Sequence, residues 1–507
     1  MNLLMKKITT LFLLIPLLFI SSSCSSKSNI SAPVTLQKFQ EQKVTWKKCY
    51  DSYLCTTIKV PIDYNSIPTG SLDISVLKAP ATKKSARIGA LVVNPGGPGG
   101  SGVDYAYNAD YIVSREIRSA YDIVGFDPRG VSRSAPIKCL TDKETDQNYA
   151  SDSKPDNAKE LASLIEDSKK YFSKCLSKTK YLNQYSTANA ARDMDILRAV
   201  LGERKLNYLG KSYGTYMGTL YAQLFPKTVG RFILDGAIDP NVPIAEQNLN
   251  QAIGFDQALS SFIKNCLTLS NCPLPKTITE ARQYFIDLLS KTSKTPLPSS
   301  SNRAVTETLV LIGTASALYD NESGWPILRS AIREANRNNG DAFLELADAY
   351  AQRNPDGTYA DNENDASVVI DCLDWKDSRT LDEIQADENK FAKQAPVFGP
   401  YLAYSSLSCK YFPQSTSTIN TGSVMIDTEI KISPILIIGT LRDPATPYKW
   451  AQGLHKIFKG SILVSLDADG HTGHGRGSLC VDDAVDAYLL VGEIPSQDLV
   501  CSLLPTV

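Results

Sequence analysis

Six short apolar runs recur along the chain, and stretches with helical periodicity separate most of them. The runs are IGALVVN (88–94), YDIVGFD (121–127), LNYLG (206–210), RFILDG (231–236), SPILIIG (433–439) and SILVSLD (461–467). Runs of this kind indicate strands buried on both faces, and parallel neighbours need helical crossovers between them. The pattern therefore predicts an α/β fold, a mostly parallel sheet flanked by helices near 187–201, 213–225, 447–458 and 481–490.

The pattern changes on either side of this alternation. CTTIKVPIDY (55–64) and LDISVLKAP (72–80) alternate as strands do and predict an antiparallel edge. Between 240 and 431 the strand signal is weak and helical patterns dominate, which indicates an insertion. We expect a sheet domain in two parts, 44–239 and 432–507, with a large, mainly helical cap at 240–431.

The most specific local signal is GKSYG, in which Gly210, Ser212 and Gly214 form GxSxG. An apolar strand precedes it and a helical stretch follows, which is the context of a nucleophile elbow with Ser212 at the sharp turn. The same letters could end a phosphate-binding loop, but that motif requires glycine at position 205, where the chain has Lys205. Ser212 is therefore the candidate nucleophile.

A serine hydroxyl needs a base to take its proton and an acid to orient that base. Asp443 follows the run 433–439 and His471 follows the run 461–467, in the chain order serine, acid, histidine. His474, in the same glycine-rich loop, is the alternative base, and we favour His471 because it lies closer to the strand end. His455 falls within an expected helix, which indicates a surface position.

The sequence NPGGPGGSG (94–102) follows a buried strand directly. Glycines allow a loop to turn its N–H groups inward, and together with the N–H of Tyr213, after the candidate nucleophile, they predict an oxyanion hole. A flexible linker is the alternative interpretation, but linkers seldom follow a buried strand without a break.

These stretches, with GFDPRGVSRS (125–134), YSTANAARDMDILRAVLG (185–202), DPATP and the tail from GHTGHGRGSLC to YLLVGEIPSQDLVC, resemble the secreted tripeptidyl aminopeptidase family. These enzymes are relatives of the proline iminopeptidases in the α/β-hydrolase superfamily, and the resemblance extends from Trp46 to Cys501. It implies the α/β-hydrolase fold and a TAP-like C-terminal part.

The resemblance also implies the roles of individual residues. Ser212, Asp443 and His471 would be nucleophile, acid and base, and Gly97 with Tyr213 would supply the oxyanion N–H groups. Asp371 and Asp374, in VVIDCLDW, are candidates to bind the ammonium group of a peptide N-terminus, with ordinary surface carboxylates as the alternative. A disulfide between Cys480 and Cys501 is implied in the same way.

The N-terminus reads as an export signal, with Lys6 and Lys7 before an apolar run from Leu11 to Ile20. Cys24 follows directly after small residues, so residues 1–24 resemble a lipoprotein signal whose Cys24 is lipidated, although an ordinary signal peptide remains the alternative. Residues 25–43 would then be a tether. We expect an exported protein, extracellular or lipid-anchored at the cell surface.

The chain has eleven cysteines, and without Cys24 an even number remains. In an exported chain this predicts disulfides, and the order of the cysteines favours pairing between neighbours without establishing connectivity. No CxxC pair is present and the histidines lie far from most cysteines, so we expect neither a metal nor a cofactor.

Charge and motifs together define the expected partners. Lys and Arg total 53 against 54 Asp and Glu, a balance that offers no footprint for nucleic acid. We expect an aminopeptidase that releases short peptides, tripeptides above all, from peptide or protein N-termini through a serine triad. An esterase or lipase-like hydrolase of the cell envelope is the alternative enzyme, and a non-catalytic surface binding lipoprotein is the alternative without catalysis.

Overall fold

A single mixed sheet forms the centre of the computed structural model, which describes residues 35–50, 52–412 and 432–503. Its strands in the described residues are β1 (Lys47–Cys49), β2 (Tyr53–Pro61), β3 (Ser71–Ala79), β4 (Gly89–Asn94), β5 (Tyr121–Phe126), β6 (Leu206–Lys211), β7 (Val229–Asp235), β8 (Ile435–Arg442), β9 (Ile462–Asp469) and β10 (Leu499–Ser502). Their order is β1-β2-β3-β5-β4-β6-β7-β8-β9-β10. The pairs from β1 to β5 are antiparallel, and all those from β5 to β10 are parallel.

The burial of the strands explains this arrangement. All residues of β4 and β5 are buried, as expected for central parallel strands covered on both faces. In β3, by contrast, exposed and buried residues alternate along the first part of the strand. The predicted antiparallel edge and the predicted parallel centre are both confirmed.

Helices account for most of the remaining described structure. They are α1 (Leu36–Gln40), α2 (Gly102–Tyr107), α3 (Ala109–Ile112), α4 (Arg115–Ala120), α5 (Asp142–Tyr149), α6 (Ala158–Lys178), α7 (Thr187–Val200), α8 (Tyr213–Leu224), α9 (Ile244–Leu267), α10 (Ile278–Lys294), α11 (Glu307–Leu318), α12 (Gly324–Ala335), α13 (Asp341–Tyr350), α14 (Glu363–Asp374), α15 (Leu381–Gln394), α16 (Gly399–Leu402), α17 (Tyr448–Ile457) and α18 (Leu479–Val491).

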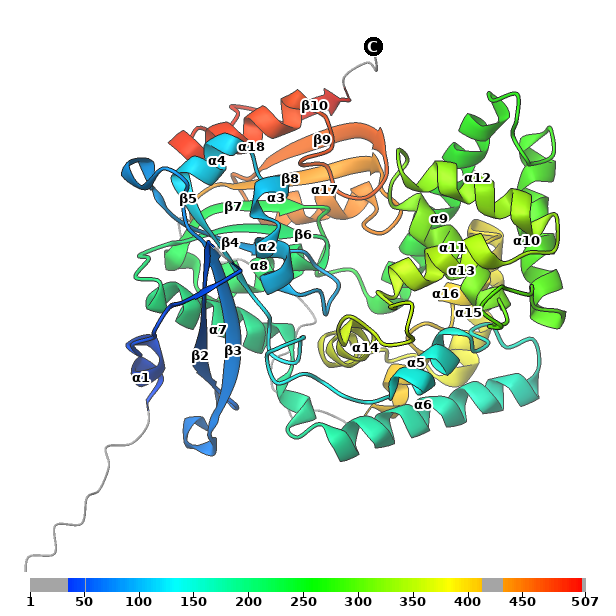
Figure 1. Ribbon diagram of the computed structural model, residues 1–507, viewed down its shortest axis with the longest axis horizontal. Coiled ribbons are helices and arrows are strands. Elements are labelled where there is room, and N and C mark those ends of the chain that lie inside the picture. Colours follow the sequence, from blue (N-terminus) through cyan, green and yellow to red (C-terminus); the bar gives the residue numbers. More distant parts are fainter. Residues whose placement is uncertain (1–34, 51, 413–431, 504–507) are drawn as a thin grey trace, which may run out of the picture. The chain divides into compact units, whose positions relative to one another are not determined.

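Two layers of these helices cover the sheet. Side chains of α7, α8 and α17 pack with one face of the strands in one apolar core, and side chains of α2, α4 and α18 pack with the other face in a second core. Figure 1 shows α18 and α4 on one side of the strands and α7 on the other. Both faces of the parallel strands are thus removed from water.

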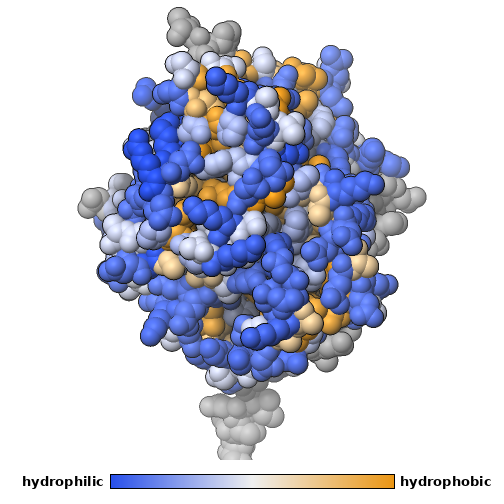
Figure 2. Space-filling model, turned by 90° about the vertical axis from the view of Figure 1, so that its right-hand side faces the viewer, coloured by the Kyte–Doolittle hydropathy of each residue, from blue (hydrophilic) through white to orange (hydrophobic). Residues whose placement is uncertain are grey.

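The helices α9 to α16 lie between β7 and β8 in the sequence, and all of them except α14 contribute to a separate apolar core. Ala366, Val369 and Ile370 of α14 pack instead in the core shared with α7 and α8. In the separate core the ring of Phe262 meets Trp325 edge-on at a centroid distance of 5.9 Å. Figure 2 shows the face over these helices, at the right of Figure 1, covered mostly by hydrophilic residues. We refer to residues 236–434 as the helical segment.

The chain before β1 contributes one structural element. Helix α1 lies within the stretch 25–43 that the sequence suggests as a tether, and Phe39 on it is buried in the core shared with α7 and α8. Cys24, the candidate lipidation site, lies outside the described residues. None of the helices in the described ranges is long and apolar enough to cross a membrane.

Five disulfides join cysteines of the described residues. They are Cys49–Cys55, Cys139–Cys175, Cys266–Cys272, Cys372–Cys409 and Cys480–Cys501. Each one joins cysteines that are neighbours in sequence order, including the Cys480–Cys501 pair that the family resemblance implied. The prediction of a disulfide-bonded chain is confirmed.

Candidate active site

Ser212 lies at the sharp turn between β6 and α8. Its φ of 54° lies in the left-handed region, which a residue without glycine's freedom adopts only when its surroundings enforce it. The backbone N–H of Ser212 donates to the carbonyl oxygen of Asp235 at 2.8 Å. A β-carbon on Gly210 would lie 2.5 Å from the carbonyl oxygen of Gly214, so the strand and the helix approach too closely for any larger residue. These features are those of a nucleophile elbow.

Asp443 follows β8 and is held by several donors. Its Oδ1 accepts hydrogen bonds from the N–H groups of Ala445 at 2.9 Å and Thr446 at 2.8 Å. Its Oδ2 accepts from the Thr446 hydroxyl and from the N–H of Thr472, each at 3.0 Å. The side chain is buried, and these donors fix its orientation.

His471 lies in the loop after β9, and its Nδ1 is 2.9 Å from both carboxylate oxygens of Asp443. A carboxylate accepts but does not donate, so the proton on Nδ1 belongs to the histidine and Nε2 is the ring nitrogen free to act as a base. The backbone N–H of His471 donates to the carbonyl oxygen of Tyr319 at 2.8 Å. The Tyr319 ring stands edge-on to the imidazole, with centroids 5.2 Å apart.

The other two histidines are placed differently. His474 is 3% exposed, and burial together with the neighbouring Lys211 lowers its pKa to about 3. Its Nδ1 has no hydrogen-bond partner within the described part of the chain. His455, on α17, pairs through Nδ1 with the hydroxyl of Ser461 at 2.8 Å. The structure therefore brings His471, and neither His474 nor His455, to Asp443.

Asp235, at the end of β7, links the loop of His471 to the elbow of Ser212. Its carboxylate accepts from the N–H groups of Gly473 at 2.7 Å and His474 at 3.0 Å, while its backbone carbonyl accepts from Ser212. Lys211 donates from Nζ to the carbonyl oxygen of His474 at 2.8 Å and lies 3.5 Å from the Asp235 carboxylate. This link could not be predicted from the sequence, in which Asp235 is simply the end of an apolar strand.

Ser212 and His471 line the same cavity, which has a volume of about 230 Å³. The other lining residues are Pro95, Gly97, Pro98, Tyr149, Tyr319, Tyr350, Ala351, Glu363, Asn364 and Ser367. They come from the glycine-rich loop after β4, from α5 and from the helical segment. Glu363 lies directly against the loop, since a β-carbon on Gly97 would lie 3.1 Å from its Oε1. A reacting group in this cavity therefore meets the serine, the imidazole and the glycine-rich loop together.

The glycine-rich loop lies directly against the elbow. Gly96 and Gly97 have φ of 105° and 110°, and a β-carbon on Gly96 would lie 3.0 Å from the Cβ of Ser212. The N–H of Gly96 donates to Asn94 Oδ1 at 3.0 Å. Within the described residues the N–H groups of Gly97 and Tyr213 donate to no protein acceptor, and Tyr213 is the first residue of α8. Two free N–H groups beside a serine are what an oxyanion hole requires.

Asp371 and Asp374, the candidate ammonium ligands, do not line this cavity. The carboxylate of Asp374 accepts from both the N–H and the hydroxyl of Thr187, and burial raises its pKa to about 7. Burial, and secondarily the charge of Asp374, raise the pKa of Asp371. The two side chains thus form an acidic pair at the end of α14, in which Asp374 is buried with a partner on α7 and Asp371 is partly buried.

Glu363, at the opposite end of α14, is the carboxylate that lines the cavity. Burial raises its pKa to about 7, and the charge of Asp361 adds to this. Gln352 donates a hydrogen bond to its Oε2. The preceding residue, Asn362, fixes the start of α14, since its amide nitrogen donates to the carbonyl oxygens of Gly130 and Ile137 at 2.8 and 2.9 Å. Glu363 was not among the residues selected from the sequence, because no motif marks it and a helical pattern does not tell which way a side chain faces.

A metal site would need several ligating side chains in one place. Across residues 35–50, 52–412 and 432–503, no group of three or more histidine, cysteine, aspartate or glutamate side chains is arranged to hold a metal ion. The chemistry considered below uses protein groups alone.

Comparisons with known proteins decide the family. A family model described as TAP-like protein matches residues 395–501. The serine protease Hip1 of Mycobacterium tuberculosis is 33% identical over 487 residues, which cover 91% of this chain and 91% of that protein. The tripeptidyl aminopeptidase of Streptomyces lividans is 30% identical over 474 residues, covering 90% of this chain and 86% of that protein. The chain belongs to the tripeptidyl aminopeptidase family of α/β-hydrolases.

Membership of the tripeptidyl aminopeptidase family makes the chain an enzyme, a serine hydrolase of the peptidase kind. Another relative carries a different name: carboxylesterase B of Mycobacterium tuberculosis is 33% identical over 463 residues, covering 88% of this chain and 86% of that protein. The mostly parallel sheet with helices on both faces is the fold that the family resemblance predicted.

Proposed function

We propose that the chain is a serine exopeptidase that releases short peptides, tripeptides above all, from free N-termini. Ser212 is the nucleophile, His471 the base and Asp443 the acid in this proposal. The observation that carries it is the contact of His471 Nδ1 with Asp443 at 2.9 Å, beside a cavity that His471 shares with Ser212. The printed name of the Streptomyces relative supports the tripeptide length.

The reaction follows from these groups. His471 Nε2 takes the hydroxyl proton as Ser212 Oγ attacks the scissile carbonyl, and the tetrahedral oxyanion accepts hydrogen bonds from Gly97 and Tyr213. The imidazolium then gives its proton to the leaving amine, which breaks the C–N bond and leaves an acyl-serine. Water, deprotonated by His471, attacks the ester carbonyl, the C–Oγ bond breaks and the imidazolium returns its proton to Ser212 Oγ. The short peptide leaves with a free carboxylate. Asp443 stabilises the imidazolium in both halves of the reaction.

Glu363 is the group we propose for binding the substrate ammonium, in place of Asp371 and Asp374. It shares the cavity with Ser212, whereas the other two carboxylates do not line it. An ionised carboxylate beside an oxyanion hole repels the charge that develops there, unless a cation neutralises it. A free N-terminal ammonium supplies that cation, while an acetylated N-terminus does not.

The size of the cavity favours cleavage near a chain end. About 230 Å³ is small for a peptide-binding site, and both the helical segment and the glycine-rich loop line it. Only a short N-terminal portion of a substrate fits between Glu363 and Ser212. This supports an exopeptidase rather than an endopeptidase.

The proposal is tested with tripeptide amides and longer peptides in free and N-acetylated forms, with products identified by mass spectrometry. We expect tripeptides from the free forms, and a loss in kcat/KM of about ten- to a hundredfold on acetylation, the size of a charge-assisted hydrogen bond. Equal cleavage of free and acetylated peptides would contradict an aminopeptidase.

An esterase is the second candidate, because the relative named carboxylesterase B is as similar in identity as the protease relative. Short-chain acyl esters in the same panel separate the two activities. A kcat/KM for esters above that for every free peptide would favour the esterase. The third alternative, a binding lipoprotein without catalysis, predicts that a fluorophosphonate leaves Ser212 unmodified.

Export to an oxidising compartment, with residues 1–24 removed and Cys24 lipidated, is also a proposal. The disulfides in the described residues support it, since such bonds persist outside the reducing cytosol. Mass spectrometry of the mature N-terminus tests it. A diacylglycerol-modified Cys24 is expected, and an unmodified N-terminus beyond Cys24 would contradict lipidation.

A further inference from the structure

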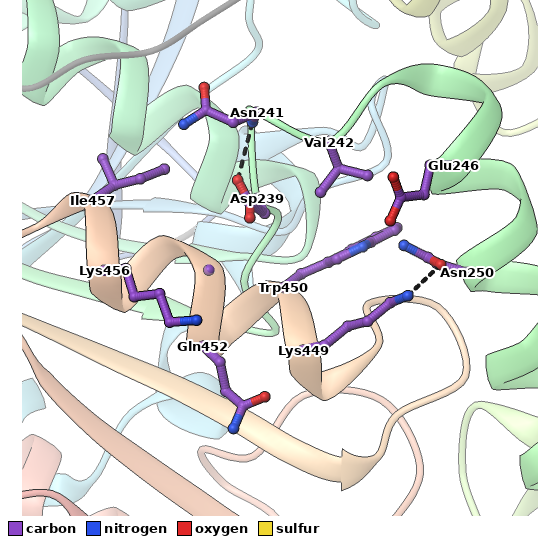
Figure 3. Close-up of a pocket in the computed structure, with 11 residues that line it drawn as sticks. Asp239, Asn241, Val242, Glu246, Asn250, Lys449, Trp450, Gln452, Lys456 and Ile457 are labelled. Atoms are coloured by element: carbon purple, nitrogen blue, oxygen red, sulfur yellow. Dashed lines mark hydrogen bonds between the residues drawn. The ribbon is translucent and has the colours of Figure 1, made fainter.

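A second cavity, of about 470 Å³, lies between α17 and the segment that runs from the end of β7 into α9. Figure 3 shows Asp239, Glu246 and Asn250 along one side of it, with Lys449 and Trp450 on α17 along the other. We call it the α9–α17 groove. It shares no lining residue with the catalytic cavity.

Two buried donors in this groove lack acceptors. Asn250 and Trp450 are 3% and 2% exposed. The Asn250 Oδ1 accepts a hydrogen bond from Lys449 Nζ, which orients the amide and leaves Nδ2 as the open end. Neither Asn250 Nδ2 nor Trp450 Nε1 has a hydrogen-bond partner among the described residues. Buried donors without acceptors are uncommon in folded proteins, so an acceptor supplied by a ligand is expected.

The charges around these donors define the ligand. Lys449 bonds the Asn250 amide and lines the groove together with Trp450, and an ammonium group with two further donors suits a carboxylate. Asp239 and Glu246 line the same groove and suit a cation. Burial raises the pKa of Asp239 and the charge of Glu246 adds to this, whereas Lys456, which also lines the groove, lowers it. The net rise means that a further cation between these two carboxylates would be favoured.

We propose that the α9–α17 groove binds the zwitterion of a short peptide or free amino acid. The carboxylate of this ligand contacts Lys449, Asn250 and Trp450, and its ammonium contacts Asp239 and Glu246. The inference rests on the groove alone and holds whether or not the catalytic cavity cleaves peptides.

The groove adjoins the loop that holds Asp443. A β-carbon on Gly254 of α9 would lie 2.6 Å from the carbonyl oxygen of Pro444, and Gln251 donates to the carbonyl oxygen of Ala445 at 2.9 Å. Helix α17 begins directly after this loop. A ligand that bridges α9 and α17 therefore joins the two helices that hold the acid loop.

The test is calorimetric titration of triglycine into the full Ser212→Ala chain, which cannot consume the peptide. We expect a dissociation constant between about 0.1 and about 5 mM. Lys449→Gln and Glu246→Gln, both at exposed positions, should each weaken binding at least about fivefold, whereas Lys459→Gln, just beyond α17, should not. N-acetyl-triglycine lacks the ammonium group and triglycine amide lacks the carboxylate, so each should also bind at least about fivefold more weakly than triglycine.

Three results would overturn the proposal. These are the absence of measurable binding, an affinity unchanged in both Lys449→Gln and Glu246→Gln, and equal affinity for the capped and uncapped peptides. Binding that survives both substitutions belongs to another site, such as the catalytic cavity. Because Lys449, Glu246 and Lys459 do not line the catalytic cavity, a loss of affinity in Lys449→Gln and Glu246→Gln but not in Lys459→Gln assigns the binding to the groove, whether or not the proposed peptidase activity is correct.

Discussion

The Lys211 ammonium group donates a hydrogen bond to the carbonyl oxygen of His474 at 2.8 Å. Lys211 directly precedes the proposed nucleophile, and His474 lies in the loop of the proposed base, so this bond fastens one catalytic loop to the other. The Asp235 carboxylate reinforces it through the N–H groups of Gly473 and His474. The relative position of Ser212 and His471 therefore depends on side chains that touch no substrate.

The first prediction concerns Ser212. Replacing it with alanine should lower kcat by roughly 10⁴- to 10⁶-fold, because only oxyanion stabilisation and binding remain. Turnover is measured together with circular dichroism and thermal unfolding, which should match the wild-type chain. A kcat within about tenfold of wild type would remove Ser212 from the triad.

The second prediction separates the two histidines of the glycine-rich loop. His471→Ala should lower kcat about as much as Ser212→Ala does, because the group that accepts the serine proton is lost. His474→Gln should keep most of the activity per folded molecule, since buried His474 does not reach Asp443. Circular dichroism and thermal unfolding give the folded fraction of both variants, and the reverse ranking of the two would transfer the role of base to His474.

The third prediction is a pH dependence. Burial raises the pKa of Glu363 to about 7, and this carboxyl must lose its proton before it can bind an ammonium group. The ratio of kcat/KM for a free peptide to that for its acetylated form should therefore rise as pH increases through about 7. It should fall again above about 8, where the substrate amine loses its charge.

Glu363→Gln is the matched variant for this pH dependence. The substitution should remove the rising limb and lower kcat/KM for free peptides about ten- to a hundredfold, while ester hydrolysis is spared. Asp371→Asn serves as the comparison, because Asp371 does not line the cavity. If Asp371→Asn shows the effect and Glu363→Gln does not, the original assignment of the ammonium site is restored.

The fourth prediction tests the link between the two catalytic loops. Lys211→Met should lower kcat by about ten- to a hundredfold with KM nearly unchanged. The substitution loosens the position of Ser212 relative to His471 but removes no contact with the substrate. Lys205→Met is the control, since Lys205 bonds the hydroxyl of Ser433 at the opposite end of β6. A kcat loss that merely follows the loss of folded protein would show a structural role only.

The fifth prediction concerns two disulfides with different loop lengths. Cys372–Cys409 closes 37 residues and Cys266–Cys272 closes 6. The lost restriction of the unfolded chain should lower the free energy of unfolding when each disulfide is replaced by a pair of serines. The expected decrease is about 4 kcal/mol for the longer loop and about 2 kcal/mol for the shorter one. Denaturant unfolding measures both. Equal losses would show that native packing, and not the entropy of the unfolded chain, dominates.

The sequence predicted most of the sheet because its central strands are buried on both faces. The run 121–127, for example, became β5 (Tyr121–Phe126). The short edge strands β1 and β10 were missed, since three or four partly exposed residues carry too little periodicity to be recognised. Likewise, the order β5-β4-β6 depends on crossovers that no local pattern records.

At the site, motif and chain order were enough to select Ser212, Asp443 and His471 as candidates. They could not select Glu363, because helical periodicity gives the spacing of side chains and not the direction in which a helix faces. Asp235 was hidden for another reason. Its carboxylate acts on backbone N–H groups of the His471 loop, which are the same in every sequence.

The hydrogen bond from the His471 N–H to the Tyr319 carbonyl has a consequence for protein engineering. Tyr319 belongs to the helical segment, so the segment that narrows the cavity also helps to seat the imidazole. Shortening these helices to admit bulkier substrates would therefore also remove the hydrogen bond that helps to hold His471, the proposed base. Broader specificity has to come from replacing individual lining side chains, such as Tyr149 or Tyr350. The helical segment as a whole cannot be shortened, because it both limits the size of the substrate and helps to position the base.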